Sequence, residues 1–239
     1  MQPSSTVFMY LLGIIAMGVG FFFFRIQAQS QARRWWGLAL LLWGLGALLA
    51  GTSYQAFSYE IKCAGQTLCS WTSWWEIAYL LLSAASVDAL LVAGAYASCL
   101  GKGRQALIKY ACLNLALYVV IVFVGAFLLN AFMISFELLL IFTAPSILVL
   151  LILHGWRYYQ FRANMDLALV ITWLWLGMVI AAYFLYWALD ITLALWARGI
   201  WFSENDVLHL GLISWMVYIA VSVSKQIWDA PRSVVEADR

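Results

Sequence analysis

The chain has 239 residues, of which 66% are hydrophobic and 10% are charged, and its formal net charge is +2. Soluble domains carry about 25% charged residues, so this composition, with a mean hydropathy of +0.91, excludes a water-soluble globular protein and predicts an all-α membrane protein. The basic residues form no cluster interleaved with aromatic side chains, so we do not expect a nucleic-acid partner.

Seven apolar stretches are long enough to cross a bilayer as helices, which need about 20 residues each. The predicted spans are Thr6–Phe24, Trp35–Phe57, Thr72–Leu100, Ala106–Leu128, Glu137–Trp156, Met165–Leu189 and Asp206–Trp228. They use most of the chain. We therefore expect one seven-helix transmembrane domain over residues 1–239, in which residues 229–239 form a short cytoplasmic tail.

The basic residues between the spans predict the orientation, because Lys and Arg collect in cytoplasmic loops. One side of the membrane holds Arg25, Arg33, Arg34, Lys102, Arg104, Lys109, Arg157, Arg162, Lys225, Arg232 and Arg239. The other side holds only Lys62 and Arg198. The N-terminus is therefore predicted outside and the C-terminus in the cytoplasm of a multi-pass protein, with the bacterial inner membrane as the expected location.

Tryptophans near the ends of the spans are typical of the aromatic belts at the two membrane interfaces. The inner belt is predicted to contain Trp35, Trp36, Trp156 and Trp228, and the outer belt Trp71, Trp74, Trp75, Trp187, Trp196 and Trp201.

The first two spans carry glycines at helix-face spacing. These are Gly13 and Gly20 in the first span and Gly37, Gly44 and Gly51 in the second. Small residues let helix backbones approach closely in lipid, so we expect these glycines to form a packing surface. Tyr54 and Gln55 follow at the predicted outer end of the second span.

Cys63 and Cys69 lie in the outer loop after the second span. An oxidising exterior permits a disulfide, and we predict that these two cysteines form one. The alternative is a pair of thiols with a metal-binding or redox role. Cys99 and Cys112, near the inner ends of the third and fourth spans, are predicted to remain reduced.

The third span contains two acidic residues. Ser73 and Glu76 fit the capping-box pattern at its start. Asp88 lies near its middle, where burial of a carboxylate is costly and often functional. Asp88 is either hydrogen-bonded to a neighbouring helix, with Asn114, Tyr118 and Thr172 as candidates, or a carboxyl that binds a proton or orients a substrate.

The fifth span contains Pro145 and His154. The proline is expected to kink or loosen the helix near its middle. His154 lies at the inner end of the span, a membrane thickness from the other histidine, so the two cannot share a metal.

The segment Asp190–Ser203, before the last span, is long and apolar. It fits a short segment lying along the outer interface or a lid over an outer cavity. In the last span Asn205, Asp206 and His209 share one helix face. Ser203 and Asp206 also resemble a capping box, which is compatible with a site role.

These groups predict a polar pocket in the outer third of the bilayer. Its ligand-binding candidates are Tyr54, Gln55, Glu76, Asn205, Asp206 and His209. One imidazole and two carboxylates can bind zinc with an open water position, so His209, Asp206 and Glu76 form a candidate zinc set, with Asp88 or Tyr54 as catalytic groups.

The helix count, the orientation and the Asn205–His209 spacing resemble the alkaline ceramidases and the progestin/adiponectin receptor group. In that family, two histidines one turn apart in the last helix help to hold zinc. In this chain Asn205 stands in place of one of them, and Phe57 follows Ser53 where the family places another histidine. The chain also looks like bacterial seven-helix proteins that end in an Asn-Asp-x-x-His segment.

Three functions remain open from the sequence. The first is a non-catalytic protein that binds a lipid or small amphiphile in the outer pocket, or serves as a homo-oligomer or a subunit of a membrane complex. The second is a metal-dependent hydrolase of a lipid amide or ester. The third is a proton-coupled transporter that uses Asp88.

Overall fold

The computed structural model describes residues 3–57, 59–63 and 72–230, and these residues form helices and connecting turns without a strand. The long helices are α1 (Pro3–Arg25), α2 (Gln31–Ala50), α3 (Trp74–Ser98), α4 (Gly101–Leu128), α5 (Phe136–Phe161), α6 (Asn164–Ala188) and α8 (Glu204–Tyr218). The shorter elements are η1 (Gly51–Ala56), η2 (Tyr59–Cys63), η3 (Phe132–Ile134), α7 (Ile191–Trp196), η4 (Ile219–Val223) and α9 (Ser224–Gln226).

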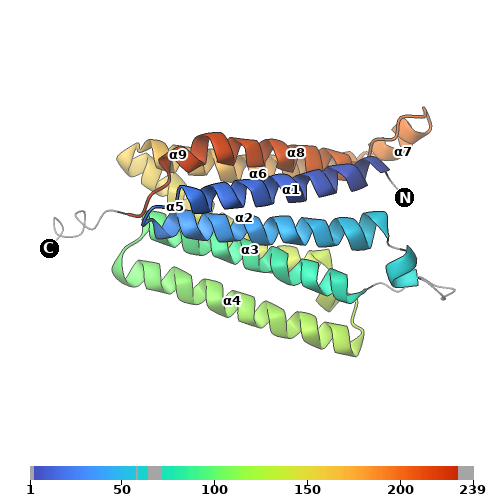
Figure 1. The fold of residues 1–239 in the computed structure, drawn as a ribbon, viewed down its shortest axis with the longest axis horizontal. Helices are drawn as coiled ribbons and strands as arrows, with labels where there is room; N and C mark the ends of the chain where they lie inside the picture. The colour runs from blue at the N-terminus through green and yellow to red at the C-terminus, as the bar shows by residue number, and fades with distance from the viewer. Residues whose placement is uncertain (1–2, 58, 64–71, 231–239) are drawn as a thin grey trace.

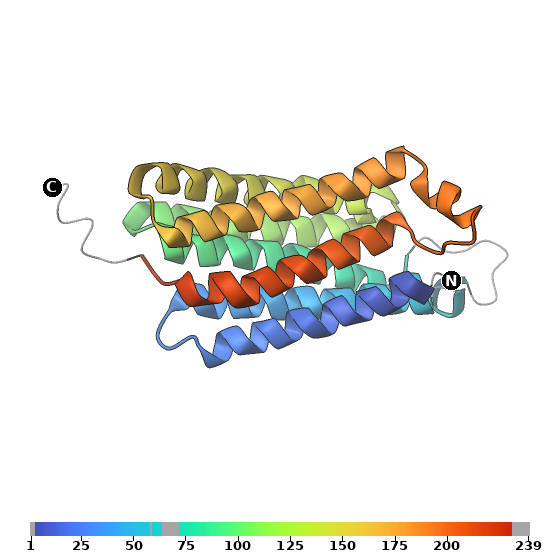
Figure 2. The same cartoon turned by 90° about the horizontal axis from the view of Figure 1, so that it is seen from above.

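Seven helical segments are long and apolar enough to cross a membrane, which confirms the predicted class of a seven-helix bundle. The helices run side by side along the long axis of the molecule, and the two ends of the chain lie at opposite ends of the bundle (Figures 1 and 2). An odd number of spans requires this arrangement. Which end faces the cytoplasm remains the prediction made from the basic residues.

Helix boundaries differ from the predicted spans mainly at the predicted cytoplasmic end. Helix α4 begins at Gly101 and α5 ends at Phe161, about one turn beyond the apolar stretches. Hydropathy marks the part of a helix that contacts lipid, whereas the backbone hydrogen bonds continue into the charged interface. Pro145 does not interrupt α5, although it removes one backbone donor.

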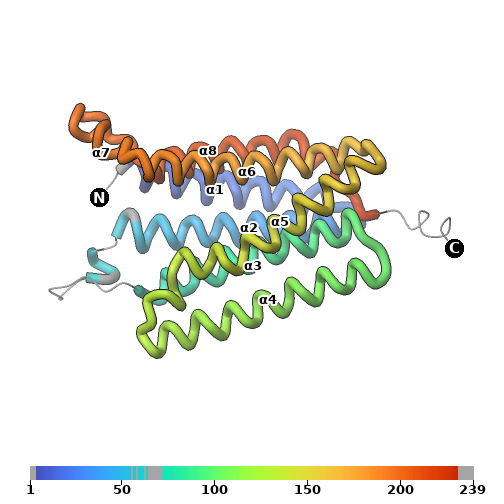
Figure 3. The backbone as a smooth tube through the Cα atoms, turned by 180° about the vertical axis from the view of Figure 1, so that it is seen from behind, coloured from blue at the N-terminus to red at the C-terminus, as the bar shows by residue number. Residues whose placement is uncertain are grey.

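Six helices form a closed circuit of neighbours. The order around it is α1, α2, α3, α5, α6 and α8, with α8 returning to α1, while α4 packs outside this circuit on α3. In Figure 3, which views the bundle from behind, α5 crosses in front of α2 and α3. The circuit leaves Asp88 on α3 facing α4 and α5, away from α8.

The glycines predicted to form packing surfaces bring α1 and α2 together. A Cβ atom at Gly20 would lie 2.9 Å from the carbonyl oxygen of Gly37, and one at Gly44 would lie 2.7 Å from that of Gly13. Because real Cβ atoms do not approach so closely, the backbones meet only where both helices carry glycine. This is the small-residue packing expected in lipid.

The interior of the circuit is filled by aromatic side chains. Phe23, Trp36 and Trp173 form a stack with ring centroids 5.9 Å apart at each step, and His154 stacks on Trp173 at 6.3 Å. The prediction that Trp36 belongs to the inner belt is therefore wrong, since only 1% of its surface is exposed. The helix periodicity turns it inward, whereas the adjacent Trp35 is only partly buried.

The last described residues of the chain bind the start of α2. The Asp229 carboxylate accepts hydrogen bonds from the Ser30 hydroxyl (2.9 Å) and from the backbone N–H groups of Gln31 (3.0 Å) and Ala32 (2.7 Å). A carboxylate at a helix N-terminus satisfies free N–H groups and complements the helix dipole. These hydrogen bonds hold the C-terminal segment against the start of α2, at the end of the bundle that carries most of the basic residues.

Arg33 also holds the C-terminal segment in place. Its guanidinium donates to the carbonyl oxygens of Ile26, Ser224 and Ile227 at 2.8–3.3 Å. It also lies 3.9 Å from the centre of the Trp228 ring, a cation–π contact. A basic residue counted as an orientation signal thus also fastens the C-terminal segment.

We predict that Asp229→Ala lowers the free energy of unfolding by about 1–2 kcal/mol, the usual effect of losing a helix cap. Thermal unfolding in detergent, followed by tryptophan fluorescence, measures the change. Glu60→Ala removes an exposed carboxylate and serves as the control. Equal stability of the Asp229→Ala variant and the wild type would contradict the capping role.

The orientation can be tested with single cysteines in a cysteine-free background. A membrane-impermeant maleimide is expected to label Ala131→Cys in intact cells, but Gln29→Cys only after permeabilisation, because these exposed residues lie at opposite ends of the bundle. The reverse pattern would overturn the predicted orientation.

Candidate functional site

Asp88 lies near the middle of α3, and only 3% of its surface is exposed. Its partners come from two other helices. The Asn114 side-chain amide on α4 lies 3.1 Å from both carboxyl oxygens, and the Ser146 hydroxyl on α5 lies 3.3 Å from Oδ1. The hydrogen bond to Asn114 is one of the interhelical contacts predicted from the sequence. Ser146 was not predicted. Its position after Pro145, as a polar residue in the middle of an apolar span, is the sequence feature that could have identified it.

Local packing fixes the position of Asn114. Its amide nitrogen also lies 3.2 Å from the carbonyl oxygen of Phe142 on α5, so one side chain joins α3, α4 and α5. Nearby, the Thr143 hydroxyl donates to the Leu139 carbonyl at 2.8 Å. The groups that surround Asp88 are therefore uncharged, and no salt bridge to Asp88 occurs within the described part of the chain.

The charge environment of Asp88 differs from that of Asp166. Asp166, at the start of α6, accepts from Arg157 at 3.0 Å, and Arg157 also donates to the carbonyl oxygen of Ser98 at 2.9 Å. An adjacent cation stabilises the ionised form of a buried carboxyl. Asp88 lacks such a cation and therefore has more freedom to change its protonation state.

Asp206 serves as a structural cap, as the sequence predicted. It forms a capping box with Ser203 at the start of α8, and its oxygens accept from the Ser203 backbone (2.7 Å) and from the hydroxyls of Ser4 (3.1 Å) and Ser5 (2.8 Å) on α1. These contacts attach the beginning of the chain to its last span and occupy both carboxyl oxygens.

His209 is buried on α8, with 3% of its surface exposed. Its Nδ1 has no hydrogen-bond partner among the described residues. Asn205 is half-buried beside it. Although Asp206 shares a helix face with His209, its carboxyl oxygens contact Ser4, Ser5 and Ser203.

The other outer-pocket candidates lie near α3. Glu76 is buried in the first turn of α3, where its backbone N–H donates to the capping Ser73 hydroxyl. The Tyr54 ring packs edge-on against Tyr79 with centroids 6.0 Å apart. The backbone of Gln55 lies in η1. In Figure 1, α1 and α2 stand between α3 and α8.

The candidate zinc set is not assembled. Within residues 3–57, 59–63 and 72–230 no group of three His, Cys, Asp or Glu side chains could hold a metal ion. The physical reason is the order of the helices, because Glu76 belongs to α3 and both Asp206 and His209 belong to α8, which are not neighbours in the circuit.

The structure describes three of the four cysteines. Cys63 is buried, but Cys69 lies outside the described residues, so the disulfide between them remains a prediction. Cys99 and Cys112 carry free thiols. Burial raises the pKa of the Cys99 thiol, against the opposing effect of Arg157 and Arg104, which disfavours a reactive thiolate there.

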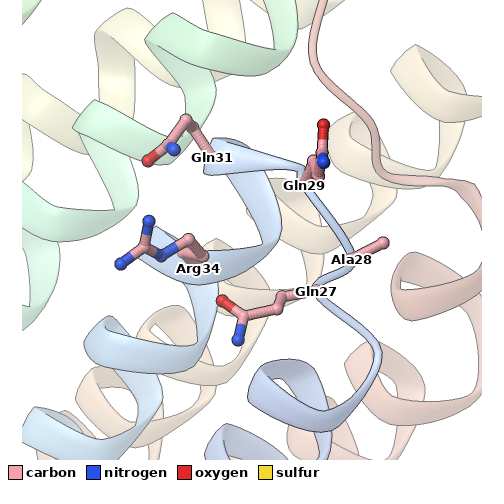
Figure 4. Close-up of a pocket in the computed structure, with 5 residues that line it drawn as sticks. All are labelled: Gln27, Ala28, Gln29, Gln31 and Arg34. Atoms are coloured by element: carbon pink, nitrogen blue, oxygen red, sulfur yellow. The ribbon is translucent and has the colours of Figure 1, made fainter.

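A surface hollow lies at the α1–α2 turn (Figure 4). It is lined by Gln27, Ala28, Gln29, Gln31 and Arg34. These side chains supply amides and one guanidinium, but no carboxylate, imidazole or thiol for acid–base or metal chemistry. The Asp88 cluster (Asp88, Asn114 and Ser146) is therefore the strongest candidate site.

The chain matches no protein-family model, no curated protein and no solved structure. The resemblance to alkaline ceramidases and adiponectin receptors is accordingly a proposal from a few residues. The function must be argued from the geometry of this molecule.

We predict that Asn114→Ala lowers the free energy of unfolding by about 1–2 kcal/mol, because it leaves a buried carboxyl with one fewer donor. The shift of the thermal unfolding midpoint in detergent measures it. Asn164→Ala, at an exposed position at the start of α6, is the control. A smaller effect at Asn114 than at Asn164 would contradict the assigned hydrogen bonds.

Proposed function

We propose that this integral membrane protein is a proton-coupled transporter in which Asp88 binds and releases the proton. The single observation that supports the proposal is a buried carboxyl, placed midway along a membrane-spanning helix, whose hydrogen-bond partners are an amide and a hydroxyl. Intramembrane carboxyls in such positions commonly belong to proton pathways.

The free energies involved favour an Asp88 carboxyl that binds and releases a proton over one that stays ionised. An ionised carboxylate at the bilayer centre costs about 3 kcal/mol on insertion scales. An interhelical hydrogen bond returns only about 0.6 kcal/mol on average. The bonds from Asn114 and Ser146 therefore do not offset the cost, whereas binding of a proton removes the charge itself.

The partners of Asp88 suit both protonation states. When Asp88 is ionised, the Asn114 amide and the Ser146 hydroxyl donate to it. When Asp88 is protonated, its own O–H can donate to the Ser146 oxygen, since a hydroxyl both donates and accepts. An Arg or Lys in place of Ser146 would supply only donors and would hold the carboxyl ionised.

The outer pocket gives weaker support for a lipid- or amphiphile-binding function. Asp206 is occupied by contacts with Ser4, Ser5 and Ser203, and Glu76 on α3 and His209 on α8 lie on helices that are not neighbours in the circuit. The hydrolase proposal lacks a gathered ligand set among the described residues. In the Asp88 cluster, by contrast, the Asp88 carboxyl is in direct hydrogen-bond contact with Asn114 and Ser146.

The test is proton flux in proteoliposomes that contain a pH-sensitive dye and are driven by an imposed membrane potential. The wild type is expected to carry protons, Asp88→Asn to fall to the level of protein-free vesicles, and Asp88→Glu to retain part of the flux. The reason is that an amide cannot bind the proton at neutral pH.

Glu137→Gln is the matched control, because it neutralises an exposed carboxyl in the first turn of α5 and is expected to leave flux unchanged. Thermal unfolding shows whether each variant is folded. Wild-type flux in a folded Asp88→Asn variant, or no flux above protein-free vesicles in the wild type, would refute the proposal.

A further inference from the structure

We infer that, in the conformation of this structure, Asp88 exchanges its proton with the outer side of the membrane, through the hydroxyls of Tyr118, Tyr79 and Tyr54, while packed apolar groups separate it from the cytoplasmic side. This inference rests on the proton-binding role proposed for Asp88. It adds the route and the side from which the proton comes.

Tyr118 is the residue next to the Asp88 cluster on this route. It lies on α4, four residues after Asn114 and thus on the same helix face, about 6 Å nearer the predicted outer end. Its surface is 0% exposed, and its hydroxyl has no hydrogen-bond partner among the described residues. A buried hydroxyl without a partner is costly, and its place beside a titratable carboxyl suggests a use for it.

Tyr79 and Tyr54 extend the route to the outer surface. Tyr79 packs against the buried cluster that contains Tyr118. Tyr79 is half-buried on α3, nine residues before Asp88, or about 13 Å along the helix. Tyr54, whose ring lies against Tyr79, is 42% exposed. Exposure thus rises from Tyr118 outward.

Tyrosine hydroxyls suit such a relay because each can accept and donate. A proton arriving from the outer side joins the oxygen of one hydroxyl as that group releases its own proton inward, through a bridging water. Each tyrosine ends neutral with one proton, as it began. The net change is one proton added to the Asp88 carboxylate, and the reverse sequence releases it outward.

Toward the predicted cytoplasmic side, the contact between α3 and α5 separates Asp88 from water. Leu150 lies one turn beyond Ser146 on α5 and is fully buried. A Cβ atom at Gly94 would lie only 2.3 Å from the Leu150 side chain, so these two residues are in tight apolar contact. The next polar group on this face is His154, which lies one turn further from Asp88 and whose Nδ1 accepts from Trp173 at 3.0 Å.

Titratable side chains on α3 and on the elements packed against it lie in both halves of the bundle. The outer half carries Glu76, Tyr79, Tyr118 and Glu137, with the more exposed Tyr54. The predicted cytoplasmic half carries Arg33, Arg34, Tyr96, Lys102, Arg104, Lys109, Tyr110, Cys112, His154, Arg157, Tyr158 and Tyr159. On α5 the members of this second group lie beyond Leu150 from Asp88.

The experiment follows the protonated carboxyl of Asp88 by its infrared C=O band, assigned by its loss in Asp88→Asn. The protein is placed in proteoliposomes whose orientation has been established by cysteine labelling, and a pH jump is applied to one side. The band is expected to respond promptly when the pH changes on the side of α7 and Tyr54, and slowly when it changes on the other side.

Tyr118→Phe removes the hydroxyl and keeps the ring. We expect the response to the outer pH jump to slow by about 10²-fold, the usual contribution of a positioned proton-transfer group, with an unchanged final band intensity. Tyr110→Phe, on the exposed face of α4, is the matched control and is expected to respond like the wild type. Leu150→Ala is expected to speed the response to the cytoplasmic side.

The outcomes separate the two proposals. A band that follows the cytoplasmic pH first, or a Tyr118→Phe variant as fast as the wild type, overturns the outward route but leaves Asp88 as the proton-binding group. A band that responds to neither side within the pH range of the stable protein overturns the proposed function as well.

Discussion

The bundle depends on close backbone contact between helices, because lipid supplies no hydrophobic drive for one apolar helix to join another. The contact between α1 and α2 illustrates the constraint. Gly20 meets Gly37 and Gly13 meets Gly44 with no space for a side chain, so dispersion between backbones holds the pair. The same principle operates between α3 and α5, where Gly94 admits Leu150.

Charged residues hold the terminal segments in place at both ends of the bundle, outside its apolar interior. Asp206 joins the start of α8 to the first residues of α1, and Asp229 joins the end of the chain to the start of α2. Each carboxylate satisfies backbone N–H groups at a helix N-terminus, where the dipole favours negative charge. The chain thus fastens its two terminal segments by the same physical device.

Asp88 stands apart from these structural carboxylates. Asp166, Asp206 and Asp229 each contact a cation or backbone N–H groups, which stabilise a fixed negative charge. Asp88 contacts an amide and a hydroxyl inside the membrane, and these groups stabilise the charge less. This difference in partners gives Asp88 its functional interest. The buried Tyr118 hydroxyl lies on the predicted outer side of Asp88 and Leu150 on the predicted cytoplasmic side, so the proposed proton exchange has a direction.

The sequence by itself determined the number of spans, the all-α class, the glycine packing surfaces of α1 and α2, and the caps at Ser73 and Asp206, because each follows from hydropathy or from spacing within one helix. It also singled out Asp88 and Asn114. The tertiary structure alone decided which helices adjoin. The sequence predicted Glu76 and His209 near one depth from their positions along their helices, but their lateral separation depends on the order of helices around the bundle. Ser146, the inward turn of Trp36 and the contact of Leu150 with Gly94 likewise depend on side chains from different helices, whose packing no single span encodes.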